Sequence, residues 1–250
     1  MKSQNLDALS RIVDLDKIEA TKNSINEANG LPNECYLNDE YFKIEREKVF
    51  FNNWIVVGVS SSVPEVGDAK PFNLMGIPLL ILRDKNNKIK VFHNVCSHRG
   101  MILVKEECKL KNTIRCPYHS WSYNFNGELI ATPHVGGMNI HETEGFIKSK
   151  SNLKEISTHV WMDLIFINVN KNKKDFEQSI DPLEKQWSKF ISKEDQKLIR
   201  HARDFGYFNM EVKSNWKLAI ENYCESYHLP WVHPELNRVS NLKDHYHIED

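Results

Sequence analysis

Two short segments of this 250-residue chain each pair a cysteine with a histidine. The first is Cys96-Ser97-His98 and the second is Cys116-Pro117-Tyr118-His119. Together they supply two thiolates and two imidazoles, all of which are metal ligands. A single Zn²⁺ accepts this set in tetrahedral geometry. A [2Fe–2S] cluster accepts it as well, with both cysteines on one iron and both histidines on the other.

The residues around the two pairs help to separate these possibilities. Arg99-Gly100 follows the first pair, Pro117 lies inside the second, and Ser120-Trp121 follows it. These flanks resemble the two cluster-binding loops of Rieske domains, in which a proline stiffens one loop and aromatic residues shield the cluster from water. The resemblance favours a Rieske [2Fe–2S] cluster. A zinc site remains the alternative.

A second constellation, Glu225-x-x-His228-x-x-x-x-His233, lies far downstream. The run from Trp216 to Tyr227 predicts a helix, on which Glu225 and His228 would share one face. Pro230 would then disturb the helix and allow His233 to turn back to the same side. Two imidazoles aimed at one point suit Fe(II) held by two histidines and one carboxylate, with positions open for O₂. The alternative is an amphipathic helix whose histidines and aromatic residues only pack.

The two motifs and the intervening Asn215-Trp216-Lys217 resemble the α subunits of Rieske non-haem iron oxygenases, also called aromatic-ring-hydroxylating dioxygenases. The resemblance runs from about Tyr41 to the end of the chain. It implies that Glu225 is a carboxylate that links a cluster histidine of one subunit to an iron-binding histidine of its neighbour. Such a carboxylate would fix the orientation and basicity of metal-bound imidazole. The implied ligands are Cys96 and Cys116 on one cluster iron, His98 and His119 on the other, and His228 and His233 on a mononuclear Fe(II).

The same resemblance implies how the protein works. A reductase, a ferredoxin or both, supplied by NAD(P)H, would reduce the cluster one electron at a time. Electrons would then pass through Glu225 to the mononuclear iron, where O₂ is activated and a small organic substrate is hydroxylated, dihydroxylated or demethylated. The two metal sites of one subunit would lie too far apart, so the subunits would form a closed head-to-tail ring, a homotrimer or a multiple of one.

The family takes a third iron ligand, an aspartate, from a helix well over a hundred residues beyond the second histidine. This chain ends at Asp250, and the carboxylates from Glu235 to Asp250 lie in the wrong stretch to match that ligand. We therefore expect the sequence to be partial, cut inside the catalytic domain, with the third carboxylate ligand outside it.

The residue at the bridging position indicates a substrate class. It is Glu225, where aromatic-ring dioxygenases usually have an aspartate. This choice resembles the branch that oxidises quaternary ammonium compounds such as choline, carnitine or betaines, so the substrate is either aromatic or quaternary ammonium. Two other classes of protein stay open: a Rieske-type electron-transfer protein without oxygenase activity, and a zinc-stabilised binding module. The downstream motif argues against the first, because an electron carrier has no use for it.

Composition excludes several classes of partner. The net charge is −1, so neither nucleic acid nor an anionic membrane is expected as a partner. The sequence contains no run of 18 apolar residues that would predict a membrane span. The N-terminus lacks an apolar signal core. Five cysteines are present, and Cys35, Cys108 and Cys224 are interpreted as reduced thiols of a cytoplasmic protein.

The spacing of apolar residues and turn signals predicts an α+β protein. We expect a helical segment over 1–45, an all-β Rieske domain over 46–170, and over 171–250 the N-terminal portion of a helix-grip type catalytic domain. The resemblance supplies the last of these. Expected helices cover 41–54, 176–199 and 216–227, and a strand at 207–212 leads into the last of them. The strands expected in the Rieske domain are 55–59, 79–83, 89–94, 113–115, 121–124, 128–130 and 161–168.

Overall fold

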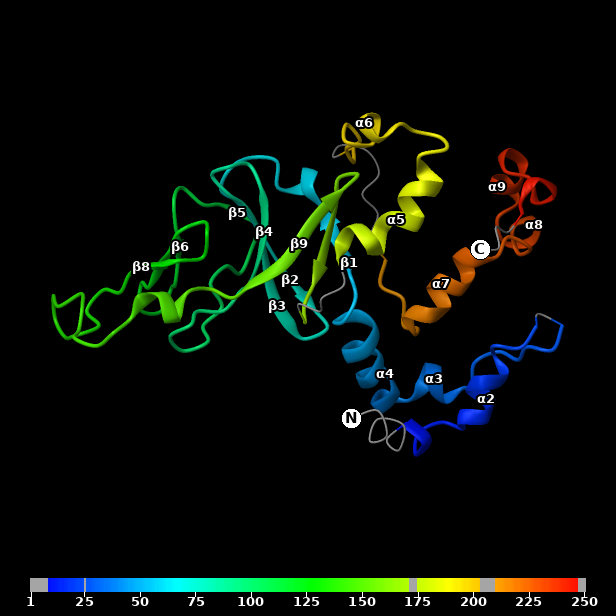
Figure 1. Ribbon diagram of the computed structural model, residues 1–250, viewed down its shortest axis with the longest axis horizontal. Helices are drawn as coiled ribbons and strands as arrows, with labels where there is room; N and C mark the ends of the chain where they lie inside the picture. Colours follow the sequence, from blue (N-terminus) through cyan, green and yellow to red (C-terminus); the bar gives the residue numbers. More distant parts are fainter. Residues whose placement is uncertain (1–8, 25, 171–174, 203–209, 247–250) are drawn as a thin grey trace. The chain divides into compact units, whose positions relative to one another are not determined.

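The computed structural model describes residues 9–24, 26–170, 175–202 and 210–246. The chain forms two compact units (Figure 1). The larger unit runs from Ile44 to Tyr207. The smaller unit combines Met1–Lys43 with Phe208–Asp250, so it joins the two ends of the sequence.

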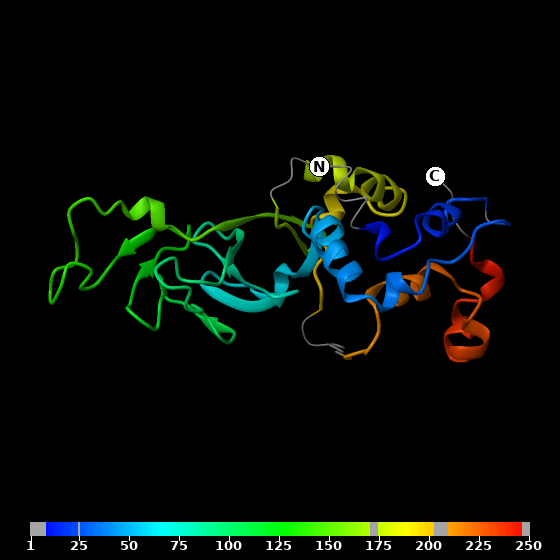
Figure 2. The same cartoon turned by 90° about the horizontal axis from the view of Figure 1, so that it is seen from below.

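The larger unit is built on an antiparallel sheet. Within its described residues, seven strands follow the order β1-β10-β9-β4-β3-β2-β5, and three short strands form a second sheet in the order β6-β7-β8. The second sheet and helix α5 (Phe176–Trp187) lie at opposite ends of this unit (Figures 1 and 2). The strands are β1 (Ile55–Val59), β2 (Asp68–Leu74), β3 (Ile77–Arg83), β4 (Ile89–His93), β5 (Cys108–Lys109), β6 (Ile114–Arg115), β7 (Ser122–Tyr123), β8 (Leu129–Ala131), β9 (Glu155–Trp161) and β10 (Leu164–Asn168).

Strand β3 is buried on both faces and separates two apolar clusters. Leu80 and Leu82 belong to a cluster that also contains the predicted ligands Cys96 and Cys116. The alternate residues of the strand, Leu79 and Ile81, belong to a second cluster that includes Val91 and Ile165. Successive side chains of a strand point to opposite faces. Each fully buried leucine contributes roughly 1.5–3 kcal/mol of stability. The cysteine loops therefore rest on a rigid sheet.

Helices flank this sheet in the larger unit. Helix α4 (Asp39–Glu45) begins in the smaller unit and ends in the larger one, where a π-helical turn (Arg46–Phe50) follows it. Two short 3₁₀ turns lie at Ser60–Ser62 and Lys148–Ser151. In α5, Phe176 and Ile180 are buried and pack against Phe166 of β10. The Asp175 side chain caps α5 by accepting from the Glu177 backbone N–H. Helix α6 covers Lys193–Gln196.

The smaller unit is helical in its described part. It contains α2 (Leu15–Ala20), α3 (Glu34–Leu37), α7 (Trp216–Cys224), α8 (Leu229–Val232), α9 (Pro234–Val239) and a 3₁₀ turn (Leu242–Asp244). Among the residues that the structure describes, no helix has the length and apolar character needed to span a bilayer. Each of the five cysteines is free.

Most expected elements are present, and the α+β class is confirmed. The strand expected at 55–59 matches β1. The strand expected at 161–168 is confirmed over its last five residues, which form β10, and is wrong over 161–163. β9 ends at Trp161, and Met162 and Asp163 turn the chain back with φ of 48° and 67°. Strands β2, β5 and β9 were not among the expected elements.

Two other expectations also differ from the structure. The helix expected at 176–199 is two helices, because α5 ends at Trp187 and α6 begins at Lys193 after a Ser192 cap. Of the strand expected at 207–212, residues 207–209 lie outside the described residues, and 210–212 form no strand. The division into three sequence segments stays a prediction.

Candidate metal sites

The two cysteine–histidine loops of the larger unit share one backbone conformation. In the first, the Cys96 N–H donates to the Met101 carbonyl at 2.8 Å, and the Gly100 N–H donates to the Cys96 carbonyl at 2.9 Å. In the second, Cys116 donates to Trp121 at 2.8 Å, and Ser120 donates to Cys116 at 3.0 Å. Gly100 and Ser120, each four residues after its cysteine, have φ of 70° and 58°. The loops are therefore structural repeats that present their ligands in the same way.

The first loop is held in place by Asn94, which is 2% exposed at the end of β4. Its side-chain Nδ2 donates to the Val104 carbonyl at 2.7 Å, and its Oδ1 accepts from the Val104 N–H at 3.0 Å. These two hydrogen bonds take the place of the backbone bonds that would join neighbouring strands, and they hold the two ends of the loop together. Paired bonds of this kind, when buried, favour one loop conformation.

The four predicted cluster ligands meet at the tips of the loops. Cys96 and Cys116 are each 2% exposed. His98 and His119 lie nearer the surface, with ring centroids 4.8 Å apart. The cysteines are thus deep and the histidines shallow. This arrangement suits two irons that differ in ligands, one buried and one near solvent.

The donor chemistry at this site fits a cluster. The Nδ1 atom of His119 is buried without a hydrogen-bond partner, and an imidazole nitrogen in that state is either a metal ligand or an energetic cost. Burial lowers the pKa of His98, and nearby His119 and Arg99 lower it further, so the ring is neutral as a metal ligand must be. Burial raises the pKa of the Cys96 thiol.

The same geometry disfavours the zinc alternative. A tetrahedral Zn²⁺ needs four donors around one point. Two pairs of ligands, one of cysteines and one of histidines, match the division expected for a two-iron cluster.

Aromatic residues enclose the site, and sequence reasoning missed the most important of them. The Trp121 ring stacks on His98 with centroids 4.5 Å apart. The Tyr123 hydroxyl, in β7, lies 3.2 Å from Cys96 Sγ and accepts from the Ser97 N–H at 3.2 Å. Tyr123 is completely buried, and burial raises the pKa of its hydroxyl, as does the bond to Cys96. An aromatic residue two positions after Trp121 was the available signal, because alternate residues of a strand share a face.

In the smaller unit, the expected helix from 216 to 227 ends early. Helix α7 ends at Cys224, and Glu225 is extended with φ −130° and ψ 156°. Glu225 and His228 therefore do not share a helical face, and that expectation is wrong. They meet instead across a tight turn, where Glu225 Oε1 contacts His228 Nδ1 and Oε2 accepts from the His228 N–H at 3.3 Å. Pro230 does not break a helix either, because it lies in the first turn of α8, where proline is tolerated.

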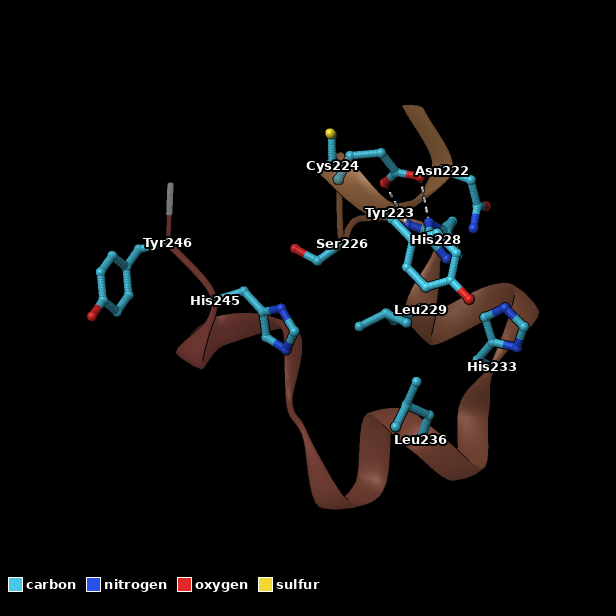
Figure 3. Close-up of a pocket in the computed structure, with 11 residues that line it drawn as sticks. Asn222, Tyr223, Cys224, Ser226, His228, Leu229, His233, Leu236, His245 and Tyr246 are labelled. Carbon is cyan, nitrogen blue, oxygen red and sulfur yellow. Dashed lines mark hydrogen bonds and ion pairs between the residues drawn. The ribbon is translucent and has the colours of Figure 1, made fainter. Parts of the chain in front are cut away.

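His228 and His233 lie immediately before and after α8, with ring centroids 5.4 Å apart. Both line a hollow of about 500 Å³ together with Glu225, Leu229 and Leu236. Figure 3 shows His228 and His233 on one side of this hollow and His245 and Tyr246 on the other. Two imidazoles that line one hollow suit Fe(II), and Glu225 beside them is the carboxylate that contacts His228. The expected third carboxylate ligand is not found among the described residues.

Comparison with known proteins agrees with this description. Residues 53–144 match the Rieske [2Fe-2S] domain family, and residues 199–250 match the catalytic domain of the ring-hydroxylating alpha subunit family. The chain therefore contains a Rieske [2Fe-2S] domain and, after it, part of a ring-hydroxylating alpha subunit catalytic domain, as its motifs indicated.

Several of the proteins that this chain resembles are named as enzymes that oxidise quaternary ammonium compounds. The chain is 29% identical to the carnitine monooxygenase oxygenase subunit of Escherichia coli K12 over 88% of this chain and 56% of that protein. It is 28% identical to the glycine betaine monooxygenase oxygenase subunit of Pseudomonas aeruginosa PAO1, over 82% and 45%. A crystal structure of the quaternary ammonium Rieske monooxygenase CntA with gamma-butyrobetaine superimposes with a TM-score of 0.70, at 28% identity, over 81% and 56%. The chain thus spans about half the length of these relatives.

Proposed function

We propose that this protein is the oxygenase subunit of a two-metal-site enzyme that inserts oxygen from O₂ into a small organic substrate. The observation that carries the proposal is the presence of two separate donor sets in one chain. Cys96, Cys116, His98 and His119 form one set, and Glu225 with His228 and His233 forms the other. An electron carrier needs only the first. When bound, a [2Fe–2S] cluster would supply electrons singly and a mononuclear Fe(II) would activate O₂.

The residues of the chain have defined tasks in this reaction. The Glu225 carboxylate accepts a hydrogen bond from the Nδ1–H of His228. The lone pair of His228 Nε2 is then left to bind a metal. The same carboxylate holds the His228 ring in one orientation. Leu229 and Leu236 line the hollow and reduce the access of water to bound substrate. A monooxygenation at this site balances as substrate–H + O₂ + 2e⁻ + 2H⁺ giving substrate–OH + H₂O.

The proposed substrate class is a quaternary ammonium compound. Two observations support it: the glutamate at position 225, and the carnitine, glycine betaine and choline monooxygenases among the relatives. One relative, 26% identical, is named 2-aminobenzenesulfonate 2,3-dioxygenase subunit alpha. Aromatic substrates are therefore included in the test. We further propose a separate reductase or ferredoxin supplied by NAD(P)H, and a homotrimer as the assembly. The cytoplasmic location stays a prediction.

The test begins with the metal content of the complete natural protein. We expect a visible spectrum of the Rieske type and about three irons per chain, two in the cluster and one outside it. The His228→Ala and His233→Ala variants should lose the third iron and keep the spectrum. Two irons in the unaltered protein would identify an electron carrier, and a colourless zinc protein would identify a binding module.

Substrate class is tested by O₂ uptake with NAD(P)H and a compatible reductase. Carnitine, glycine betaine, choline and gamma-butyrobetaine are compared with benzoate and naphthalene at equal concentrations. We expect uptake coupled to product with at least one quaternary ammonium compound and none with the aromatic ones. Coupled uptake with an aromatic compound alone would overturn the substrate proposal and leave the oxygenase proposal intact.

A further inference from the structure

Helix α7 leads directly into Glu225, yet it buries almost none of its own apolar surface. Its one buried residue in the described structure is Lys217, which is 7% exposed. Leu218 and Ile220 are 47% and 51% exposed. A helix is normally fixed by an apolar stripe against its neighbours. In the part of the chain described, the contacts made by α7 include polar and aromatic ones, and Tyr36 and Tyr41 of the N-terminal segment supply several of them.

Three side chains of α7 contact one residue of α3, Tyr36. The Tyr36 hydroxyl donates to Glu221 Oε1 at 2.6 Å. The Asn215 side chain donates from Nδ2 to the Tyr36 carbonyl at 3.1 Å, while its Oδ1 caps α7 at the Lys217 N–H. The Lys217 Nζ lies 5.3 Å from the centre of the Tyr36 ring. Tyr36 therefore contacts α7 at its cap, its first turn and its second turn.

Lys217 is surrounded by aromatic rings. Its Nζ lies 5.3 Å from the ring centre of Tyr36, 5.5 Å from that of Tyr41 and 5.2 Å from that of Trp216. A buried ammonium group is costly unless its charge is compensated, and the faces of aromatic rings attract it. Tyr36 and Tyr41 precede the residues matched by either family, 53–144 and 199–250. The N-terminal segment thus supplies two of the three rings.

The link between Tyr36 and Glu221 is stable over the physiological pH range. Burial raises the pKa of Tyr36 to about 12, and the hydrogen bond to Glu221 contributes to this shift. The hydroxyl therefore keeps its proton and continues to donate. Glu221 lies one helical turn before Glu225, the residue that contacts His228. A rotation of α7 would displace Glu225 and, through it, the His228 ring.

We propose that Tyr36 and Lys217 are positioning residues for the mononuclear metal site. The cation–π contacts of Lys217 and the Tyr36–Glu221 bond, here named the α7 clamp, set the orientation of α7 and hence that of the Glu225–His228 pair. The inference rests on the proposed function, because it assumes that His228 and His233 bind a metal. It assigns a role in that site to an N-terminal segment that carries none of the predicted ligands.

The test measures Co²⁺ affinity at the mononuclear site of the complete natural protein with its cluster assembled, by the Co²⁺ absorbance spectrum. Lys217→Met keeps the side-chain length and removes the charge. We expect it to weaken Co²⁺ binding about tenfold, as loss of a residue supporting a ligand does. Lys217→Arg keeps the cation over the rings and should restore binding to nearly the original value. Lys213→Met, an exposed lysine before the same helix, is the matched control and should leave binding unchanged.

A second pair of variants separates positioning from general destabilisation. Tyr36→Phe keeps the ring and loses the hydroxyl, so it remains informative if Lys217→Met does not fold, and its Co²⁺ affinity should fall severalfold. Lys217→Met combined with Glu225→Gln should weaken Co²⁺ binding no more than Glu225→Gln does, because effects that act through one residue do not add. Folded Lys217→Met and Tyr36→Phe variants with unchanged Co²⁺ affinity would overturn the clamp. An unaltered protein that binds no Co²⁺ at His228 and His233 would overturn the proposed function, and the clamp with it.

Discussion

The Tyr123 hydroxyl lies 3.2 Å from the Sγ of Cys96, and both side chains are buried. The hydroxyl also accepts from the Ser97 N–H and lies 2.9 Å from Ser97 Oγ. A ligating cysteine is a thiolate and has no proton to give, so Tyr123 is the donor to sulfur when the site holds a cluster. Its hydrogen bond should stabilise the reduced cluster, which carries more negative charge, over the oxidised one.

Tyr123→Phe should therefore lower the reduction potential of the cluster. A hydrogen bond to a charged group is worth about 1.5–3 kcal/mol. If the reduced state loses about 1.4 kcal/mol of this relative to the oxidised state, the potential falls by about 59 mV for one electron. Protein-film voltammetry measures it. Tyr118→Phe is the control, because Tyr118 packs on His119 and is 57% exposed. An unchanged potential in Tyr123→Phe would show that the hydroxyl does not tune the cluster.

Asp163 gives the larger unit a defined dependence of stability on pH. Its carboxylate accepts from the Ser60 hydroxyl at 2.6 Å, the Ser61 N–H at 3.1 Å and the His201 N–H at 2.9 Å. Burial alone would raise the pKa of Asp163, but these hydrogen bonds outweigh it and hold the pKa below its ordinary value. A carboxyl with a depressed pKa adds stability above its unfolded pKa of about 3.9, and that contribution is lost as pH falls through the folded value.

Asp163→Asn should lower the unfolding free energy at pH 7 by about 1–3 kcal/mol. The amide NH₂ is itself a donor, so it cannot accept the hydrogen bonds that one carboxylate oxygen now accepts. The difference from the unaltered protein should shrink as pH falls below about 4. Urea unfolding at a series of pH values measures both quantities. Asp181→Asn, which removes an exposed ion pair with Lys185, should change stability by less than about 1 kcal/mol. A penalty for Asp163→Asn that is constant down to pH 3 would contradict this account.

Gly67 and Gly76 have similar backbone conformations but different surroundings, so the same substitution at each tests the close approach of Leu110 to Gly67. Both have positive φ, 89° and 95°. A Cβ at position 67 would lie 2.1 Å from the Leu110 carbonyl oxygen, whereas one at position 76 would meet nothing within 4 Å. Gly76→Ala should therefore cost only the conformational strain, about 1 kcal/mol. Gly67→Ala should cost at least about 3 kcal/mol, since Leu110 must also move away from its bond to Gly67. Equal unfolding free energies for the two variants would contradict the predicted contact.

The candidate ligands could be identified from sequence because their spacing is itself the chemical signal. The structure brings His98 and His119 together as expected, and likewise His228 and His233. Tyr123 could not be assigned in this way. Its role depends on a hydrogen bond between β7 and a loop 27 residues earlier, and no local pattern reports such a bond.

The errors in secondary structure have local physical causes. The sequence prediction omitted β9 and began the next strand at Trp161, three residues before β10. Met162-Asp163 has no glycine to mark the turn between them, and the bonds that Asp163 accepts maintain that turn. It extended α7 to Tyr227 because helical periodicity continues past the point where the chain becomes extended at Glu225. There the Glu225 carboxylate bonds the backbone N–H of His228, so a side chain replaces the next helical turn.

Glu225 Oε1 directly contacts Nδ1 of the His228 ring. Glu225→Gln keeps the size of the side chain but replaces a charged acceptor with a neutral one, so the His228 ring is held less firmly in its orientation. Loss of such a partner weakens metal binding by about 10–100-fold. We expect Co²⁺ affinity at the His228–His233 site to fall by at least about tenfold, while the visible spectrum of the cluster is unchanged. Glu235→Gln, which removes only an exposed ion pair with Arg238, should match the unaltered protein. Unaltered Co²⁺ affinity in Glu225→Gln would mean that His228 is oriented by some other group, and the role proposed for Glu225 would have to be abandoned.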